Sequence, residues 1–282
     1  MLVEVILIVL VLCALVVASI TDIRSREVPD WVSYMLIAAA FVVRLWYAFS
    51  SQHWSFFGFG VLGFALASAI GLVLFFSKQW GGGDAKLLMG FGVVFATNPS
   101  WYASPIPLFV AVLFNLVVVG AVYGIVASLL LAFVHHREFM KSFMVVGHNK
   151  WLRLAKVVGL LVAVGLYLFV TFADVVAGWI LLVIASILVV YPWLLQVMKA
   201  VEQACLVKKV PVAKVTEGDW LVDDAVRKRF AIPSYGIEAK QLKKLQSSKI
   251  AFVVVKEGIP FVPALLVAVV VSLVFGFWLP VF

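Results

Sequence analysis

Long apolar runs dominate this sequence, and they limit its possible folds more than any other feature. A helix needs about 20 apolar residues to cross the ~30 Å hydrocarbon core of a bilayer. Eight such runs, of which the fourth is short, cover residues 2–20, 31–49, 56–76, 85–97, 108–134, 154–172, 175–197 and 260–281. Hydrophobic residues make up 65% of the 282 residues and charged residues 13%, whereas soluble domains carry about 25% charge. The sequence therefore predicts an all-α polytopic membrane protein with about eight transmembrane helices.

Lysine and arginine are confined to alternate loops. Basic residues lie in or directly beside the loops between runs one and two, three and four, five and six, and seven and eight. The other loops and both termini have none, and Arg44 in the second run is the exception. Since basic loops stay in the cytoplasm, we expect a multi-pass protein of the cell membrane with both termini outside. The net charge of +8 is thus explained by topology and contact with the lipid bilayer, and not by nucleic-acid binding.

One sizeable polar segment precedes the last run. Residues 208–215 alternate like a strand, residues 220–222 fit a second strand, and residues 237–245 have apolar residues at helical spacing. We expect a small cytoplasmic α+β domain there. The predicted divisions are 1–198 for helices one to seven with the catalytic loops, 199–258 for the cytoplasmic domain and 259–282 for the last helix.

Two aspartates lie at the predicted cytoplasmic ends of helices. Gly81, Gly82 and Gly83 lead directly into Asp84, which occupies an N-cap or first-turn position before the fourth run. Asp22 follows the first run, far away in sequence but on the same predicted face. Two close carboxylates share a proton, so one can activate a water while the other acts as general acid. The pair predicts hydrolytic chemistry, with the glycines giving a substrate backbone room to approach.

The residues alone leave other interpretations open. Asp22 could cap a turn or pair with Arg24 or Arg26, and Lys86 could neutralise Asp84. Glu27 or Asp30 could be the partner of Asp84 instead. A transporter is a further alternative, in which Arg44, Asp22, Asp84 and Asp174 would form ion sites beside a broken helix.

Two segments resemble the prepilin peptidases, which are GxGD membrane aspartic proteases. Residues 21–31 are similar to the first-aspartate stretch of that family, although Asp30 stands where asparagine is commoner. Residues 81–86 are similar to its GxGD motif, including the lysine that follows. Residues 217–221 and 256–263 resemble elements of archaeal members. Six helices are usual in the family, so two additional ones are a departure.

The resemblance implies an aspartic endopeptidase that removes basic leader peptides from pilin-like or archaeal flagellin precursors at the cytoplasmic face. Asp22 and Asp84 would be catalytic, and Gly81, Gly82, Gly83 and Lys86 would form the active-site loop. Glu27 and Asp30 are expected to contact the basic leader. Paired CxxC motifs, which accompany N-methylation in bacterial members, are missing. We therefore expect no methyl transfer, and no metal or cofactor.

A second protease family shares the GxGD motif. Presenilin and signal peptide peptidase also have a Pro-Ala-Leu element, which Pro263, Ala264 and Leu265 match. Their first aspartate follows a tyrosine on the helix next to the GxGD helix, whereas here Thr21 precedes Asp22 and two predicted helices intervene. An intramembrane protease of that type remains the alternative enzyme.

Overall fold

The chain is a mostly helical, multi-pass membrane protein with one small sheet. The structure, a computed structural model, describes residues 2–77, 79–173, 178–233, 236–248 and 250–277. Six described helices are long and apolar enough to cross a bilayer: α1 (Leu2–Ser25), α2 (Asp30–Ser51), α3 (Trp54–Phe76), α5 (Leu108–Val134), α7 (Lys150–Ala173) and α8 (Gly178–Val201). Two shorter apolar helices are α4 (Gly82–Val94) and α11 (Val262–Phe275). The count of eight spans stays a prediction, because these two are shorter than a bilayer requires.

The short helix α4 lies at the centre of the bundle. It packs against α3 and α2 and touches α1, and most of its residues, from Ala85 to Val94, are buried on every side of the helix. Its closest neighbour is α3. A Cβ atom on Gly63 would lie 2.1 Å from the carbonyl oxygen of Gly92, and one on Gly92 would lie 2.2 Å from that of Gly63. Glycine at both positions therefore lets the two backbones touch, as in other membrane helix pairs.

A buried arginine satisfies the C-terminal end of α4. Arg44 of α2 is completely buried, and its guanidinium donates hydrogen bonds to the carbonyl oxygens of Val93 (2.6 Å) and Val94 (3.2 Å). It also donates to the carbonyl oxygen of Phe56 and the hydroxyl of Thr97. The last carbonyls of a helix have no partner within the helix, and water is absent from the bilayer core. Arg44 therefore allows α4 to end inside the bundle.

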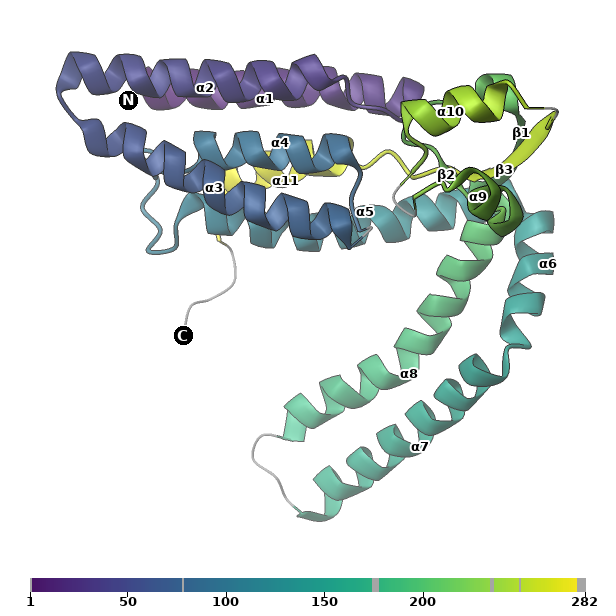
Figure 1. Cartoon of the computed structure of the whole chain (residues 1–282). Coiled ribbons are helices and arrows are strands. Elements are labelled where there is room, and N and C mark those ends of the chain that lie inside the picture. The colour runs from purple at the N-terminus through teal and green to yellow at the C-terminus, as the bar shows by residue number, and fades with distance from the viewer. Residues whose placement is uncertain (1, 78, 174–177, 234–235, 249, 278–282) are drawn as a thin grey trace.

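α11, which is late in the sequence, packs beside the first helix, α1. It packs between α5 and α1, and Asn115 of α5 donates hydrogen bonds to the Ser272 hydroxyl and the Gly276 carbonyl (2.9 Å each). In Figure 1 the helices of this bundle run side by side, with the small domain at one end. We call this end, at which α1 stops and α4 and α11 begin, the polar end.

Residues 135–150, which we expected to be a polar connection, instead form helix α6 (His136–Gly147). Apolar side chains recur there at Phe139, Met140, Phe143 and Met144, the spacing of an amphipathic helix. α7 and α8 then form a hairpin that leads away from the bundle (Figure 1). Gln196 of α8 joins this hairpin to α6 by donating to the Phe143 carbonyl oxygen (2.7 Å) and accepting from Lys156 of α7. Asp174, which the transporter alternative would place in an ion site, lies outside the described residues.

The small domain at the polar end contains a three-stranded antiparallel sheet in the order β1-β3-β2. Its elements are the π-helical turn Glu202–Leu206, β1 (Val207–Pro211), the 3₁₀ turn Val212–Lys214, β2 (Trp220–Leu221), α9 (Asp224–Phe230), α10 (Ala239–Gln246) and β3 (Phe252–Lys256). It has an apolar core of its own, separate from that of the bundle. The alternating pattern predicts a strand that continues to residue 215, but β1 ends at Pro211. Strand β3 was not expected from the sequence.

Removing the Arg44 guanidinium should destabilise the whole bundle. Arg44→Met leaves buried carbonyls of α4 unsatisfied, and each buried unsatisfied group costs about 1–3 kcal/mol. We expect Arg44→Met to lower the free energy of unfolding by more than about 3 kcal/mol and Arg44→Lys, which keeps a cationic donor, to lower it less. Thermal unfolding of the detergent-solubilised protein measures both. Arg24→Met, which changes an exposed arginine of α1, serves as the control, and equal Tm values for all three variants would contradict the role of Arg44.

Candidate active site

Asp84 lies in the first turn of α4. The structure begins this helix at Gly82, so two of the three glycines are helical and only Gly81, the N-cap, has an extended backbone. This corrects the start of the fourth run at residue 85. The Asp84 carboxylate accepts the backbone N–H of Gly81, which satisfies one of the free donors at the start of the helix. The partial positive charge of the helix N-terminus also favours an acid here.

Asp22 lies in the last turns of α1, on the face that packs into the bundle. The buried residues of α1 recur every three or four positions, at Val3, Leu7, Val11, Leu15, Ala18, Ser19 and Asp22. The Asp22 side chain is 7% exposed. Its Oδ2 accepts the backbone N–H of Val262 (2.9 Å), and the N–H of Phe261 also interacts with the carboxylate. The carboxylate of Asp22 therefore caps the start of α11.

The structure places the two predicted carboxylates at the same end of the bundle. α1 contacts α4, and the Asp22 carboxylate lies within electrostatic range of the Asp84 carboxyl group. Sequence reasoning did not find the backbone of Phe261 and Val262 that holds Asp22. The available signal was Pro260 and Pro263, because proline beside the first turn is typical of a helix start. Pro263 and the buried Ala264 and Leu265 thus follow directly after the group that binds Asp22.

The glycine motif meets the loop that follows Asp22. A Cβ atom on Gly83 would lie 2.8 Å from the Cβ of Val28, closer than two such carbons can approach. A Cβ on Gly82 would lie at an ordinary 3.7 Å from a ring carbon of Phe75. The two glycines therefore differ in purpose, and Gly83 is needed to let α4 approach the segment after α1.

The charged neighbours of the pair have partners of their own. Lys86 places its Nζ 2.5 Å from Oδ1 of Asp30 and 5.4 Å from the ring centre of Tyr34. Lys86 therefore pairs with Asp30, and not with Asp84 as the sequence left open. Asp30 is the first residue of α2, and Pro29 is the N-cap, so Asp30 does not cap that helix.

Two contacts attach the small domain to the loop after α1. The Thr216 hydroxyl donates to Oε1 of Glu27 (2.9 Å), and the Arg26 guanidinium donates to the carbonyl oxygen of Gly258. Asp219 accepts the N–H of Thr216 (2.8 Å). Burial raises the pKa of the Asp219 carboxyl, the hydrogen bonds from Thr216 oppose this, and the charges of Glu27 and Glu257 add to the rise. Acidic side chains therefore gather where the domain meets the candidate site.

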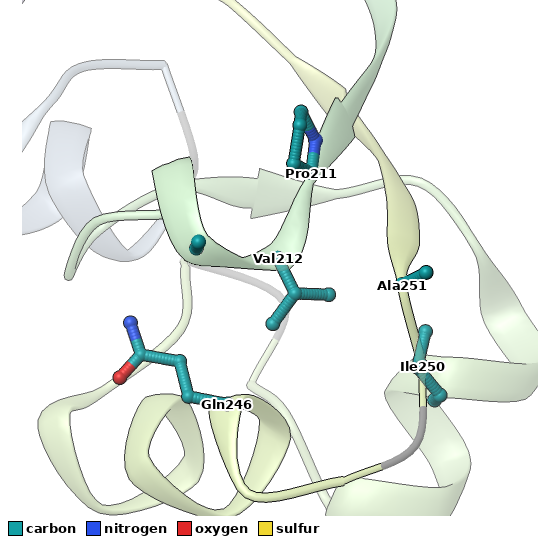
Figure 2. A pocket seen from close by; sticks show the side chains of 6 residues that line it. Pro211, Val212, Gln246, Ile250 and Ala251 are labelled. Carbon is teal, nitrogen blue, oxygen red and sulfur yellow. The ribbon is translucent and has the colours of Figure 1, made fainter.

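A hollow in the small domain is a different feature. It measures about 420 Å³ and is lined by Pro211, Val212, Ala213, Gln246, Ile250 and Ala251 (Figure 2). None of these side chains is titratable, so the hollow offers no acid, base or nucleophile. In the part of the chain that the structure describes, no three His, Cys, Asp or Glu side chains gather as a metal site would require.

Residues 9–125 match the model of the type IV leader peptidase family. This segment contains both aspartates, the glycine motif and the loop between α1 and α2. This part of the chain is therefore similar to the type IV leader peptidases. The α7–α8 hairpin and the small domain lie outside the matched part.

Two curated relatives are similar to a shorter part of the chain. The preflagellin peptidase of Methanococcus maripaludis is 30% identical over 80 residues, which is 28% of this chain and 34% of the relative. The preflagellin peptidase of Methanocaldococcus jannaschii is 31% identical over 80 residues, with the same shares. The chain thus matches about a third of the length of these relatives. No solved structure matches it.

Substituting the two helical glycines should separate their roles. Gly83→Ala forces α4 away from Val28 and displaces Asp84, and a misplacement of about 1 Å can cost about a hundredfold in rate. We expect Gly83→Ala to reduce the proteolytic turnover proposed below at least tenfold, whereas the neighbouring Gly82→Ala should keep most of it. Cleavage of a leader-bearing precursor by the two purified variants measures the difference. A Gly83→Ala protein as active as Gly82→Ala would show that the approach to Val28 has no part in the site.

Proposed function

We propose that this chain is a membrane aspartic endopeptidase that removes basic leader peptides from type IV pilin-like or flagellin precursors. The observation that carries the proposal is that Asp22 and Asp84 lie within electrostatic range of each other at one end of the bundle, in a segment that matches the model of the type IV leader peptidases. The names of the two archaeal relatives support a flagellin-like precursor as the substrate class. Cleavage without methyl transfer is part of the proposal.

The two carboxylates divide the chemistry between them. Both carboxylates interact with a backbone N–H at a helix start, and Asp22 also lies within electrostatic range of the Arg26 guanidinium, whose positive charge favours an ionised acid. We therefore assign Asp22 the role of base, which takes a proton from water as the water oxygen bonds to the scissile carbonyl carbon. Asp84 holds the shared proton and gives it to the amide nitrogen as the C–N bond breaks. The products are a free carboxyl group and a free amine.

The charge distribution supports an orientation for this reaction. Arg24, Arg26 and Lys86 lie at the polar end with the lysine-rich small domain, whereas the loops at the opposite end of the bundle lack lysine and arginine. By the positive-inside rule the polar end faces the cytoplasm of a cell membrane. Both chain ends then lie outside, and the two carboxylates lie at the cytoplasmic side, where newly made precursors arrive.

Glu27 is the acid best placed to receive a basic leader. Asp30 already pairs with Lys86, so its charge is partly neutralised. Glu27 is exposed, with a hydroxyl as its partner, beside Asp219 and Glu257. Glu257 is paired with Lys208. Glu27, a few residues after Asp22, and Asp219 therefore supply the negative charge that a leader bearing lysine or arginine would meet.

The direct test is co-expression with a tagged pilin-like precursor. Wild type should shorten the precursor, whereas Asp22→Asn and Asp84→Asn should each leave it intact, because each removes one of the two proton-transferring groups. The loss expected is at least about a thousandfold, as for other essential catalytic acids and bases. Immunoblotting of precursor and mature forms measures it.

Two controls make this result decisive. Asp224→Asn, which changes an exposed acid of α9 that pairs with Arg227, should process normally. Membrane levels of all variants must match. The proposed function would be refuted if both aspartate variants shorten the precursor as much as wild type does. Cuts inside the membrane-spanning helix of the precursor would favour the presenilin-like alternative.

Neutralising Glu27 should weaken binding without slowing the chemistry. Glu27→Gln keeps an acceptor for Thr216 and removes the charge, so KM for a basic-leader precursor should rise several-fold while kcat stays unchanged. Initial rates at increasing precursor concentration measure both constants. A precursor whose leader lysines and arginines are replaced by glutamine should not distinguish Glu27→Gln from wild type. If Glu27→Gln raises KM equally for both precursors, charge complementarity is not the cause.

A further inference from the structure

α5 carries a tyrosine that the packing of the bundle does not explain. The polar side chains of this otherwise apolar helix are Asn115, Tyr123 and Ser128. Asn115 binds Ser272 and Gly276 and so fixes α5 against α11. Tyr123 lies eight residues further along, about 12 Å closer to the polar end, and a tyrosine hydroxyl within an apolar helix usually serves a polar partner.

Tyr123 lies beside the start of α11. Three residues before it, Gly120 faces Phe261 so closely that a Cβ atom would lie 3.0 Å from the Phe261 ring. Residues three apart on a helix lie on neighbouring positions of one face. Phe261 immediately precedes Val262, whose N–H binds Asp22. The same ring packs against Trp80, which leads into the glycine motif, with 5.7 Å between ring centres.

The surroundings of the tyrosine are those of the carboxylate pair. Its hydroxyl lies within electrostatic range of the Asp22 carboxylate and the Arg26 guanidinium. Its side chain remains partly accessible. Tyr123 therefore lies one turn beyond the contact of Gly120 with Phe261, within electrostatic range of the carboxylate to which we assign the role of base, and is only partly covered by packing.

We propose that Tyr123 is a third catalytic residue, whose hydroxyl donates a hydrogen bond to the scissile carbonyl oxygen. This inference rests on the proposed function. As the water oxygen bonds to the carbonyl carbon, the π electron pair of the C=O bond moves onto the oxygen. Tyr123 keeps its proton and stabilises that negative charge, while Asp22 takes the water proton and Asp84 protonates the leaving nitrogen.

Neither carboxylate can donate a hydrogen bond to the scissile carbonyl oxygen. Asp22 in its base form has no proton to donate, and the one proton on Asp84 is required by the leaving amide nitrogen. The Val262 N–H already donates to Asp22, and Lys86 is engaged with Asp30. A neutral hydroxyl from α5 supplies the missing donor without adding charge beside the pair.

Tyr123→Phe tests this assignment, since it removes one oxygen atom and keeps the ring. Loss of a single donor to a developing oxyanion can cost about 10²–10³ in kcat. We expect kcat for precursor cleavage to fall at least about tenfold, KM to change less than about twofold, and Tm to stay the same. Tyr167→Phe, in exposed surface of α7, is the matched control and should behave as wild type.

A second variant separates catalysis from packing. Replacing Tyr123 by 3-fluorotyrosine keeps both ring and hydroxyl, so kcat should be retained even if Tyr123→Phe unfolds. The inference is overturned if Tyr123→Phe has the wild-type kcat, if only its KM rises, or if the 3-fluorotyrosine protein is as slow as Tyr123→Phe. When wild type cleaves the precursor and both aspartate variants fail, such a result refutes the role of Tyr123 alone. A wild type that does not cleave refutes the proposed function and this inference with it.

Discussion

A helix of 13 residues spans about 20 Å and cannot bring both of its ends to water across a bilayer. In this protein that helix is α4, and its two ends are satisfied in different ways. The C-terminal carbonyls accept hydrogen bonds from the buried Arg44. At the polar end, the backbone N–H of Gly81 interacts with the carboxylate of Asp84. Because the far end is fixed by an arginine inside the bundle, the near end, with its acid, is fixed as well.

The second carboxylate depends on a contact between opposite ends of the chain. Asp22 ends the buried stripe of α1, and the N-terminus of α11 provides the donor that holds it. A buried acid without such a donor is costly, and the first turn of a helix has N–H groups to spare. The Asp22 carboxylate and the N–H of Val262 therefore satisfy each other. α11 must be in place before Asp22 has its final orientation.

The sequence was sufficient to predict the long apolar helices and to place the two acids at helix ends on one side, and insufficient to predict the partners of these acids. Asp84 could be placed because three glycines before an acid mark a helix start, and the stripe from Val3 to Asp22 carries the same information for α1. Lys86 shows where such reasoning stops: it follows Asp84 closely, yet its ammonium reaches Asp30 on α2. The main partners of Arg44 and Asp22 are backbone groups of distant segments. Nearly every residue has a backbone carbonyl and N–H, so the sequence does not show which of them will bind a given side chain. Helix α6 was missed because its polar and basic residues outweighed its apolar spacing.

The small domain is tied to the candidate site by the chain itself as well as by side chains. Strand β3 ends at Lys256 and α11 starts at Val262, so a short connection joins the sheet to the group that binds Asp22. Arg26 and Glu27 contact the domain just after Asp22. A movement of the domain would therefore reach Asp22 from two sides. By contrast, the α7–α8 hairpin meets the bundle mainly beside α5 and α6, so these two helices lengthen the chain without entering the site.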